Sequence, residues 1–151
     1  MQKMNSKTAK QKGFTLLEVV IAIAIIALLA AFILPGLLQN REDAKLSTAL
    51  TQLQKDFPSA ITRQVARTQS CTTTNLSKAN LIARGLPAQT VWNTQWTPSV
   101  VGTNIVQVVY TIDSTDSATA SDLAAALNAS NNVQTATATG NASVTVTYRC
   151  N

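Results

Sequence analysis

Histidine is absent from this sequence, and charged residues make up only 13% of its 151 residues. The absence of histidine removes the most common general base and the most common metal ligand of proteins. Two cysteines cannot fill a four-ligand zinc site without histidine or carboxylate partners. The C-terminal part has no paired glutamates, and the chain has no glycine-rich phosphate loop. The composition therefore predicts a protein that is not an enzyme and that holds no cofactor and no metal.

The formal net charge of +5 and the pI of about 9.6 suggest nucleic-acid binding at first sight, but the positive charge is concentrated at the N-terminus. Four lysines precede residue 13, namely Lys3, Lys7, Lys10 and Lys12. From residue 14 onward, eight basic residues stand against seven acidic ones, which leaves a charge of +1. The basic character therefore belongs mostly to a short N-terminal segment and not to a binding face.

One long apolar run extends from Phe14 to Leu38, reads FTLLEVVIAIAIIALLAAFILPGLL and contains a single charge, Glu18. As a helix this run would be about 37 Å long, which is enough to span a bilayer. Basic residues before it predict that the N-terminus stays in the cytoplasm. A cleaved secretory signal has a shorter apolar region, of about 7–15 residues. A plain membrane anchor explains the length but not the carboxylate, which is costly in hydrocarbon and therefore needs a partner.

Residues 12–18 read Lys-Gly-Phe-Thr-Leu-Leu-Glu, directly before and within the apolar run. This pattern resembles the type IV pilins and their relatives, which carry class III signal sequences. The resemblance covers residues 1 to about 40. It implies that a prepilin peptidase cuts between Gly13 and Phe14, that Phe14 is then N-methylated, and that Glu18 is the glutamate at the fifth mature position. Pro35 also fits, because a proline that kinks the helix is common at this place in the family.

Cleavage after Gly13 would free a positive, poorly solvated amine at the edge of an apolar helix. The Glu18 carboxylate can neutralise this amine in its own subunit or in a neighbour, because a buried pair is tolerated where one unpaired charge is not. The family resemblance implies pairing with an adjacent subunit, which would fix the axial stagger. Pro35 removes one helical hydrogen bond and bends or melts the helix locally. An equally good interpretation is that Pro35 marks the bend where the helix leaves the membrane.

After Gln39 the pattern becomes amphipathic, with apolar residues at spacings of 4, 3 and 4: Leu46, Leu50, Leu53 and Phe57. It predicts that the same helix continues over residues 41–70, with a break or kink near Phe57–Pro58. Arg63 and Arg67 lie one turn apart, and we interpret them as a solvated face. DNA binding through Arg63, Arg67 and Arg84 is a weaker alternative, since residues 41–151 carry only a small net positive charge.

The remaining sequence, residues 71–151, predicts a globular head with short helices and strands. We expect Trp92 and Trp96 to be core or edge packing. The whole chain is predicted to be α+β, with a long N-terminal helix spine and an antiparallel sheet packed on it. The expected elements of the head are a helix over 78–84, a strand over 105–112, a helix over 122–127, and a hairpin of 133–139 with 143–148.

The chain has two cysteines, Cys71 and Cys150, both beyond the membrane segment. In a non-cytoplasmic compartment an even count predicts one disulfide, and the alternative is two free buried thiols. The loop of about 80 residues would contribute about 4.5 kcal/mol in the chain-entropy model. Pilins carry a C-terminal disulfide loop, and these cysteines match it. The loop size resembles type IVb heads, whereas Phe14 resembles type IVa, so the subclass stays open.

The resemblance implies four parts: a leader over 1–13 that is removed, a transmembrane or filament-core helix over 14–40, its amphipathic continuation over 41–70, and the head. It implies a precursor in the inner membrane that a platform complex and an assembly ATPase move into a helical homopolymer. The expected function is therefore a structural subunit, the major pilin of an extracellular type IV pilus on the bacterial surface, used in adhesion, motility, DNA uptake or conjugation.

The alternative is a pseudopilin of a type II secretion system, or a minor pilin, because these proteins share the N-terminal motif. Major pseudopilins usually bind calcium and usually lack a disulfide. Asp113 and Asp116 share one loop and are a weakly supported candidate for a calcium site, but we interpret them in the first place as turn-forming residues. The cysteine pair favours a pilin.

Overall fold

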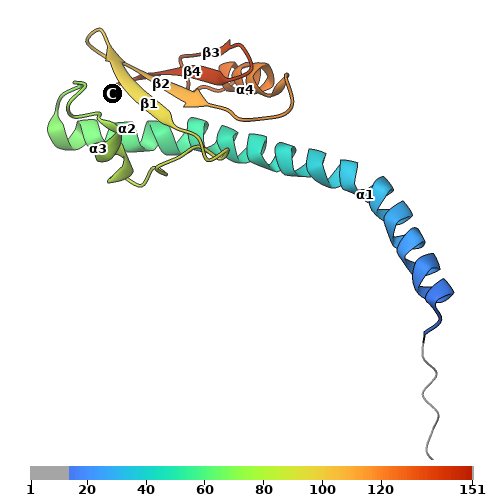
Figure 1. Cartoon of the computed structure of the whole chain (residues 1–151). Helices are drawn as coiled ribbons and strands as arrows, with labels where there is room; N and C mark the ends of the chain where they lie inside the picture. The colour runs from blue at the N-terminus through green and yellow to red at the C-terminus, as the bar shows by residue number, and fades with distance from the viewer. Residues whose placement is uncertain (1–13, 151) are drawn as a thin grey trace, which may run out of the picture. The chain divides into compact units, whose positions relative to one another are not determined.

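The computed structural model of this chain describes residues 14–150, so the predicted leader, including Gly13, lies outside the described residues. The chain divides into two compact units, one up to Gln39 and one from Asn40 onward. The first long helical segment contains α1 (Leu16–Thr51), a π-helical turn η1 (Gln52–Asp56) and α2 (Phe57–Thr68). The elements that follow are α3 (Lys78–Ile82), β1 (Trp96–Val101), β2 (Ile105–Thr111), α4 (Thr119–Asn128), β3 (Thr135–Thr139) and β4 (Ser143–Arg149) (Figure 1).

The N-terminal unit consists of the apolar part of α1. The helix begins after Thr15, whose Oγ1 accepts a hydrogen bond of 3.3 Å from the backbone N–H of Glu18, as an N-capping threonine does. Apolar side chains lie on all sides of the helix, so it has no single apolar face that would pack against the rest of this chain. The segment is long and apolar enough to cross a membrane. Pro35 lies within α1, which remains helical there, so the helix is not melted at this residue.

The C-terminal unit contains a four-stranded antiparallel sheet in the order β1-β2-β4-β3. Side chains alternate along the strands, as the period of two requires. The inward positions of β2 and β4 are fully or almost fully buried: Val106, Val108, Tyr110, Val144, Val146 and Tyr148. Threonine dominates the outer positions of β3 and β4. The predicted α+β fold, with the sheet packed on the helical segment, is therefore confirmed (Figure 1).

Phe57 is at the centre of the core, where the helical segment meets the sheet. Its ring is fully buried and contacts Trp96 edge-on at a centroid distance of 5.0 Å. It also lies 6.2 Å from Tyr110 and 6.5 Å from Tyr148. Trp92 and Trp96 are both buried, which confirms that they are packing residues. Aromatic rings of this size dominate the burial energy of a small core.

The free edge of the sheet at β3 is covered by α4. The side-chain amide of Asn128 donates to the carbonyl of Ala136 at 2.8 Å and accepts from its N–H at 2.7 Å. Asn128 thus imitates a neighbouring strand at this point. Leu123 and Leu127 bury the inner face of α4 in the same core. An edge protected in this way is less open to pairing with another chain.

Several predicted elements differ in detail from the structure. The strand β1 was not predicted, because Pro98 lies inside it and proline is tolerated only on edge strands such as this one. The helix expected over 78–84 ends at Ile82, and Gly85 follows at a φ of 104°, which only glycine adopts freely. The expected break at Phe57–Pro58 takes the form of the π-helical turn immediately before it, so the helix continues.

Candidate functional site

The apolar surface of α1 is the most unusual feature of the molecule. Sixteen large apolar side chains between residues 14 and 38 are exposed by about half or more; Phe14 is 83% exposed and Leu16 82%. Soluble monomers rarely expose apolar patches larger than a few hundred Å². This surface therefore requires lipid or other protein chains as its surroundings.

Glu18 is the single charge on this surface. Its backbone N–H bonds to Thr15, but its carboxylate has no hydrogen-bond or ion-pair partner among the described residues. A lone carboxylate on a surface that avoids water is costly, and a positive partner would stabilise it. Phe14 lies in the same N-terminal stretch of the described residues, and Gly13 lies outside them.

A second group of polar contacts attaches the helical segment to the head at Glu42. One of its carboxylate oxygens accepts from Trp92 Nε1 and from Ser114 Oγ, both at 3.1 Å. The other oxygen accepts from Lys45 Nζ at 2.7 Å. The bond from Lys45, followed by the bond from Trp92, lowers the pKa of Glu42 below its ordinary value of 4.5. Two segments of the head, near residues 92 and 114, are thus held to one carboxylate of the helix.

The π-helical turn is the next point of attachment. Inside it, the N–H of Phe57 bonds to Gln52 O, five residues earlier, and Pro58 has no N–H to donate. The carbonyl of Leu53 is thereby left without a helical donor, and the Tyr148 hydroxyl donates to it at 2.8 Å. Asn132 Nδ2 donates to the next carbonyl, that of Gln54, at 3.1 Å. Side chains of the head therefore replace the hydrogen bonds that the turn gives up.

Tyr110 makes a similar connection at Gln52, one residue before Leu53 in the same turn. Its hydroxyl donates to Gln52 Oε1 at 2.8 Å and accepts from the N–H of Val91 at 3.1 Å. Burial raises the pKa of Tyr110 to about 12 and raises the pKa of Tyr148 well above 10. Both phenols are therefore neutral donors at any physiological pH.

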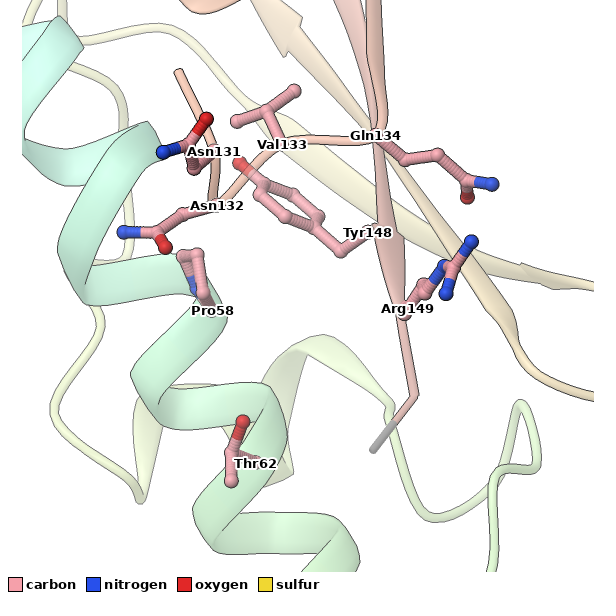
Figure 2. A pocket seen from close by; sticks show the side chains of 8 residues that line it. All are labelled: Pro58, Thr62, Asn131, Asn132, Val133, Gln134, Tyr148 and Arg149. Atoms are coloured by element: carbon pink, nitrogen blue, oxygen red, sulfur yellow. The ribbon is translucent and has the colours of Figure 1, made fainter.

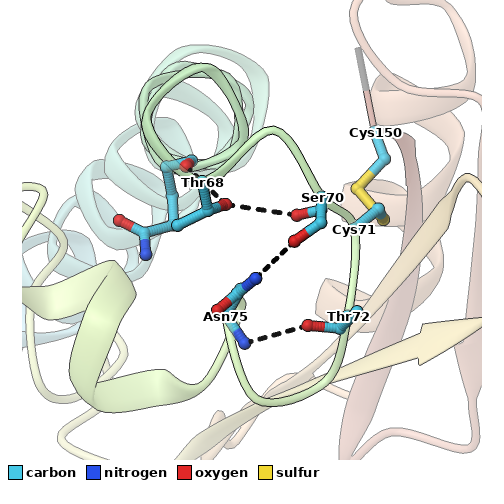
Figure 3. Close-up of a disulfide and its surroundings, with 7 residues drawn as sticks. Thr68, Ser70, Cys71, Thr72, Asn75 and Cys150 are labelled. Carbon is cyan, nitrogen blue, oxygen red and sulfur yellow. Dashed lines mark hydrogen bonds between the residues drawn. A yellow bond between two sulfur atoms is a disulfide. The ribbon is translucent and has the colours of Figure 1, made fainter.

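A disulfide joins Cys71 to Cys150, with the two Cα atoms 6.0 Å apart (Figure 3). It connects the end of the helical segment to the end of β4, which is an inner strand of the sheet. The loop leading into it is ordered by side chains: Asn75 Nδ2 donates to Ser70 Oγ, and Thr68 Oγ1 donates to Ser70 O. The C-terminal strand is thus covalently attached to the helix that the head covers.

A polar cavity of about 460 Å³ lies between α2 and the end of β4. Figure 2 shows Pro58 and Thr62 on the helix side, with Tyr148 and Val133 facing them across the cavity. The other lining residues are Asn131, Asn132, Gln134 and Arg149. The hydroxyl groups in this lining are those of Thr62 and Tyr148.

The two aspartates predicted as a calcium candidate act in part as turn residues. Asp116 Oδ1 accepts from the N–H of Ala118 at 2.9 Å, which is an Asx-type contact before α4. Asp113 is exposed. In residues 14–150, no three His, Cys, Asp or Glu side chains are grouped so that they could hold a metal ion.

The N-terminal region of the chain is similar to known sequences. The prokaryotic N-terminal methylation motif matches residues 8–34, which include the proposed cleavage site, Glu18 and most of the apolar run. The chain therefore carries a prepilin motif, as the resemblance in its sequence implies.

Two curated relatives of this chain are type II secretion system core protein G of Vibrio cholerae and the protein of the same description from Escherichia coli. The first is 47% identical over 47 residues, which is 31% of this chain and 32% of the relative. The second is 44% identical over 46 residues, or 30% of this chain and 32% of the relative. The chain therefore matches about a third of the length of these relatives. No solved structure matches this chain.

The contacts around Glu42 and the π-helical turn were not predicted. Those that reach the head join residues at least 50 positions apart, and no local pattern reports such a pairing. The available signals were a glutamate within the amphipathic stretch and a proline directly after Phe57. The three arginines considered for DNA binding partly come together: Arg63 Nη1 donates to the carbonyl of Arg84 at 3.3 Å, and Arg67 lies one turn further along α2.

Proposed function

We propose that this chain is a filament-forming structural subunit of the type IV pilin class, and that its filament is a surface pilus. The observation that carries the proposal is the exposed apolar helix of α1, whose one carboxylate has no partner among residues 14–150, in a chain that carries a prepilin motif. The precursor would be anchored in the inner membrane by this helix. Polymerisation would replace lipid contacts with helix–helix contacts and so bury the same surface.

The processing and assembly steps follow from the chemistry of the N-terminus. A prepilin peptidase would cut between Gly13 and Phe14 and methylate the new amine of Phe14. The Glu18 carboxylate would pair with the Phe14 amine of a neighbouring copy, so that both charges are neutralised inside the apolar filament core. Pro35 would let the helix bend within that core. A platform complex and an assembly ATPase would supply the work of extraction from the membrane.

The head would form the filament surface, and its construction suits that position. It is tied to the helical segment by the Glu42 contacts, by Tyr148 and by the disulfide. A disulfide between Cys71 and Cys150 requires an oxidising compartment, which supports exposure outside the cytoplasm. Adhesion, motility, DNA uptake and conjugation are all compatible with such a filament.

The second candidate is a pseudopilin of a type II secretion system, which the similarity to core protein G favours. That similarity covers only about a third of each chain, and the motif it shares is common to both classes. The disulfide favours the pilus. A pseudopilin would share the processing and the polymerisation proposed above but would remain in the cell envelope.

The test is the intact mass and the location of the mature protein. Filaments sheared from cells should contain a species that begins at methylated Phe14, is lighter than the reduced form by two hydrogen atoms, and is abundant. The same species found only in the envelope would select the pseudopilin. A different N-terminus would contradict the processing site and, with it, the assignment of Glu18.

A further inference from the structure

The charges of the C-terminal unit are strongly segregated along the sequence. The 56 residues from Phe57 to Ile112 contain no acidic residue, and their four basic residues are Arg63, Arg67, Lys78 and Arg84. From Gly85 to Tyr148 there is no basic residue, and the acidic ones are Asp113, Asp116 and Asp122. The only ion pair among residues 14–150 is Lys45–Glu42, so these opposite charges are not paired within one copy.

Three of the basic side chains form one surface, which we call the arginine face: Arg63, Arg67 and Arg84. Arg63 bonds to the carbonyl of Arg84 at 3.3 Å and to Ser59 Oγ at 2.7 Å. Arg84 Nε donates to Gln64 Oε1 at 2.9 Å, and Gln64 is buried. These bonds hold two of the three guanidinium groups in place, so less entropy is lost when the face binds an anionic partner.

The three aspartates form the acidic segment, residues 113–122, between β2 and the first turn of α4. All three are exposed. Ser114 Oγ donates a hydrogen bond to the Glu42 carboxylate, which places this segment beside the part of α1 that contains Glu42. Arg63 lies 21 residues further along the same helical segment, which corresponds to about 30 Å. The acidic segment and the arginine face therefore lie at opposite ends of this unit (Figure 1).

We propose that the arginine face of one copy binds the acidic segment of a second copy of this chain. The inference rests on the proposed filament, in which copies lie side by side with parallel helices. An axial offset of about 30 Å between two copies would bring the acidic segment of one level with the arginine face of the other. The contact would mainly determine the axial register between two copies and the choice of partner, and it would add less to affinity, as is usual for complementary surface charges.

The first experiment is cross-linking with a chain that carries both Arg67→Cys and Asp113→Cys. Neither original side chain makes a hydrogen bond or an ion pair within residues 14–150, so the substitutions should leave the fold intact. Sheared filaments are treated with a short bis-maleimide, which reacts with free thiols and not with the Cys71–Cys150 disulfide. The expected result is a ladder of linked subunits that neither single variant gives. Intact filaments without a ladder would overturn the proposal, and so would a ladder from either single variant.

The second experiment exchanges the charges. Arg67→Glu and Asp113→Lys should each reduce sheared filament by about tenfold, because like charges then face each other, and the combined variant should recover most of it. Lys55→Glu is the matched control, because it makes the same charge change on the exposed π-helical turn; it should stay within about twofold. Intact mass beginning at Phe14 checks processing in every variant. Single reversals that assemble normally would overturn the proposal.

Two further outcomes separate this inference from its alternatives. Filaments that bind duplex DNA through Arg63 and Arg67, with strong salt dependence and no cross-linked ladder, would assign the arginine face to nucleic acid instead. A wild-type protein that forms no polymer, on the cell surface or in the envelope, would contradict the proposed function itself. The charge inference is therefore tested only on polymers that have been shown to exist.

Discussion

Trp92 Nε1 donates a hydrogen bond of 3.1 Å to a carboxylate oxygen of Glu42, which lies 50 residues earlier in the chain. The same oxygen accepts from Ser114, so one half-exposed carboxylate joins the helix to two separate loops of the head. Hydrogen bonds to charged groups are stronger than those between neutral ones. This relationship makes Glu42 a specific point at which the attachment of the head can be weakened.

Replacing Glu42 should weaken the head measurably. Glu42→Ala leaves the indole N–H of the buried Trp92 without its partner, and we expect a loss of about 1–3 kcal/mol in the free energy of unfolding. Denaturation of the purified protein in detergent, followed by tryptophan fluorescence, measures this loss. Asp43→Asn is the matched control, because Asp43 is exposed and adjacent; it should change stability by less than about 0.5 kcal/mol.

The same residue predicts a dependence on acid. The pKa of Glu42 is lower in the folded state than its ordinary value of 4.5, because Lys45 and Trp92 bond to the charged form. The stabilisation is therefore fully present above pH 4.5 and is lost as the pH falls through the lowered pKa. Stability measured from pH 7 downward should fall less steeply in Glu42→Gln than in the wild type. Identical slopes would contradict this role of the carboxylate.

The π-helical turn supplies a test of how side chains of the head replace helical hydrogen bonds. Tyr148→Phe removes the only donor shown for the buried carbonyl of Leu53, and we expect it to cost about 1–3 kcal/mol. Asn132→Ala removes an exposed bond to Gln54 and should cost less. Asn131→Ala is its matched control, because Asn131 is the neighbouring exposed amide. Chemical denaturation of the four proteins gives the order directly, and a neutral Tyr148→Phe would contradict the argument.

The folded head could be predicted from sequence where the signal is local. Alternation over 143–148 and the Gly140–Asn141 turn predict the hairpin, and apolar spacing predicts the amphipathic helix; both are present. The strand β1 could not be predicted in this way, because Pro98 argues against a strand unless its position at the sheet edge is known. Edge position is a property of the whole sheet.

The functional residues show the same contrast between features that are local in the sequence and features that depend on the whole fold. The N-terminal motif is contiguous, so it could be predicted from a few residues, and the roles of Phe14 and Glu18 are proposed from it. The contacts of Glu42 and Tyr148 depend on pairs 50 and 95 residues apart, and only the folded chain brings them together. The π-helical turn was partly foreseeable, since Pro58 indicated a disturbance, but its form depends on the donors that the head provides.

The disulfide should contribute more to stability than any of these hydrogen bonds. Cys71→Ser with Cys150→Ser opens a loop with a sequence separation of 79 residues, and the chain-entropy model gives a loss of about 4.5 kcal/mol. The strand β4 pairs with both β2 and β3, so its release would loosen the centre of the sheet. Thermal unfolding of the double variant, compared with the wild type with and without reductant, measures the effect. A reductant that leaves the melting temperature of the wild type unchanged would contradict it.

Substitutions of Glu18 test the processing step and the assembly step separately. Its carboxylate has no partner among the described residues of its own chain, and the proposed partner is the Phe14 amine of a neighbour. Glu18→Ala should therefore leave cleavage after Gly13 intact but reduce sheared filament to a small fraction of the wild-type amount. Glu18→Gln keeps the size and polarity of the side chain but removes its charge, so it should fail to the same degree if neutralisation of the amine is the reason. Mass spectrometry of the membrane fraction checks cleavage, and immunoblots of the sheared fraction measure assembly. Normal filaments from Glu18→Gln would show that shape, and not charge, is what the filament core requires of this residue.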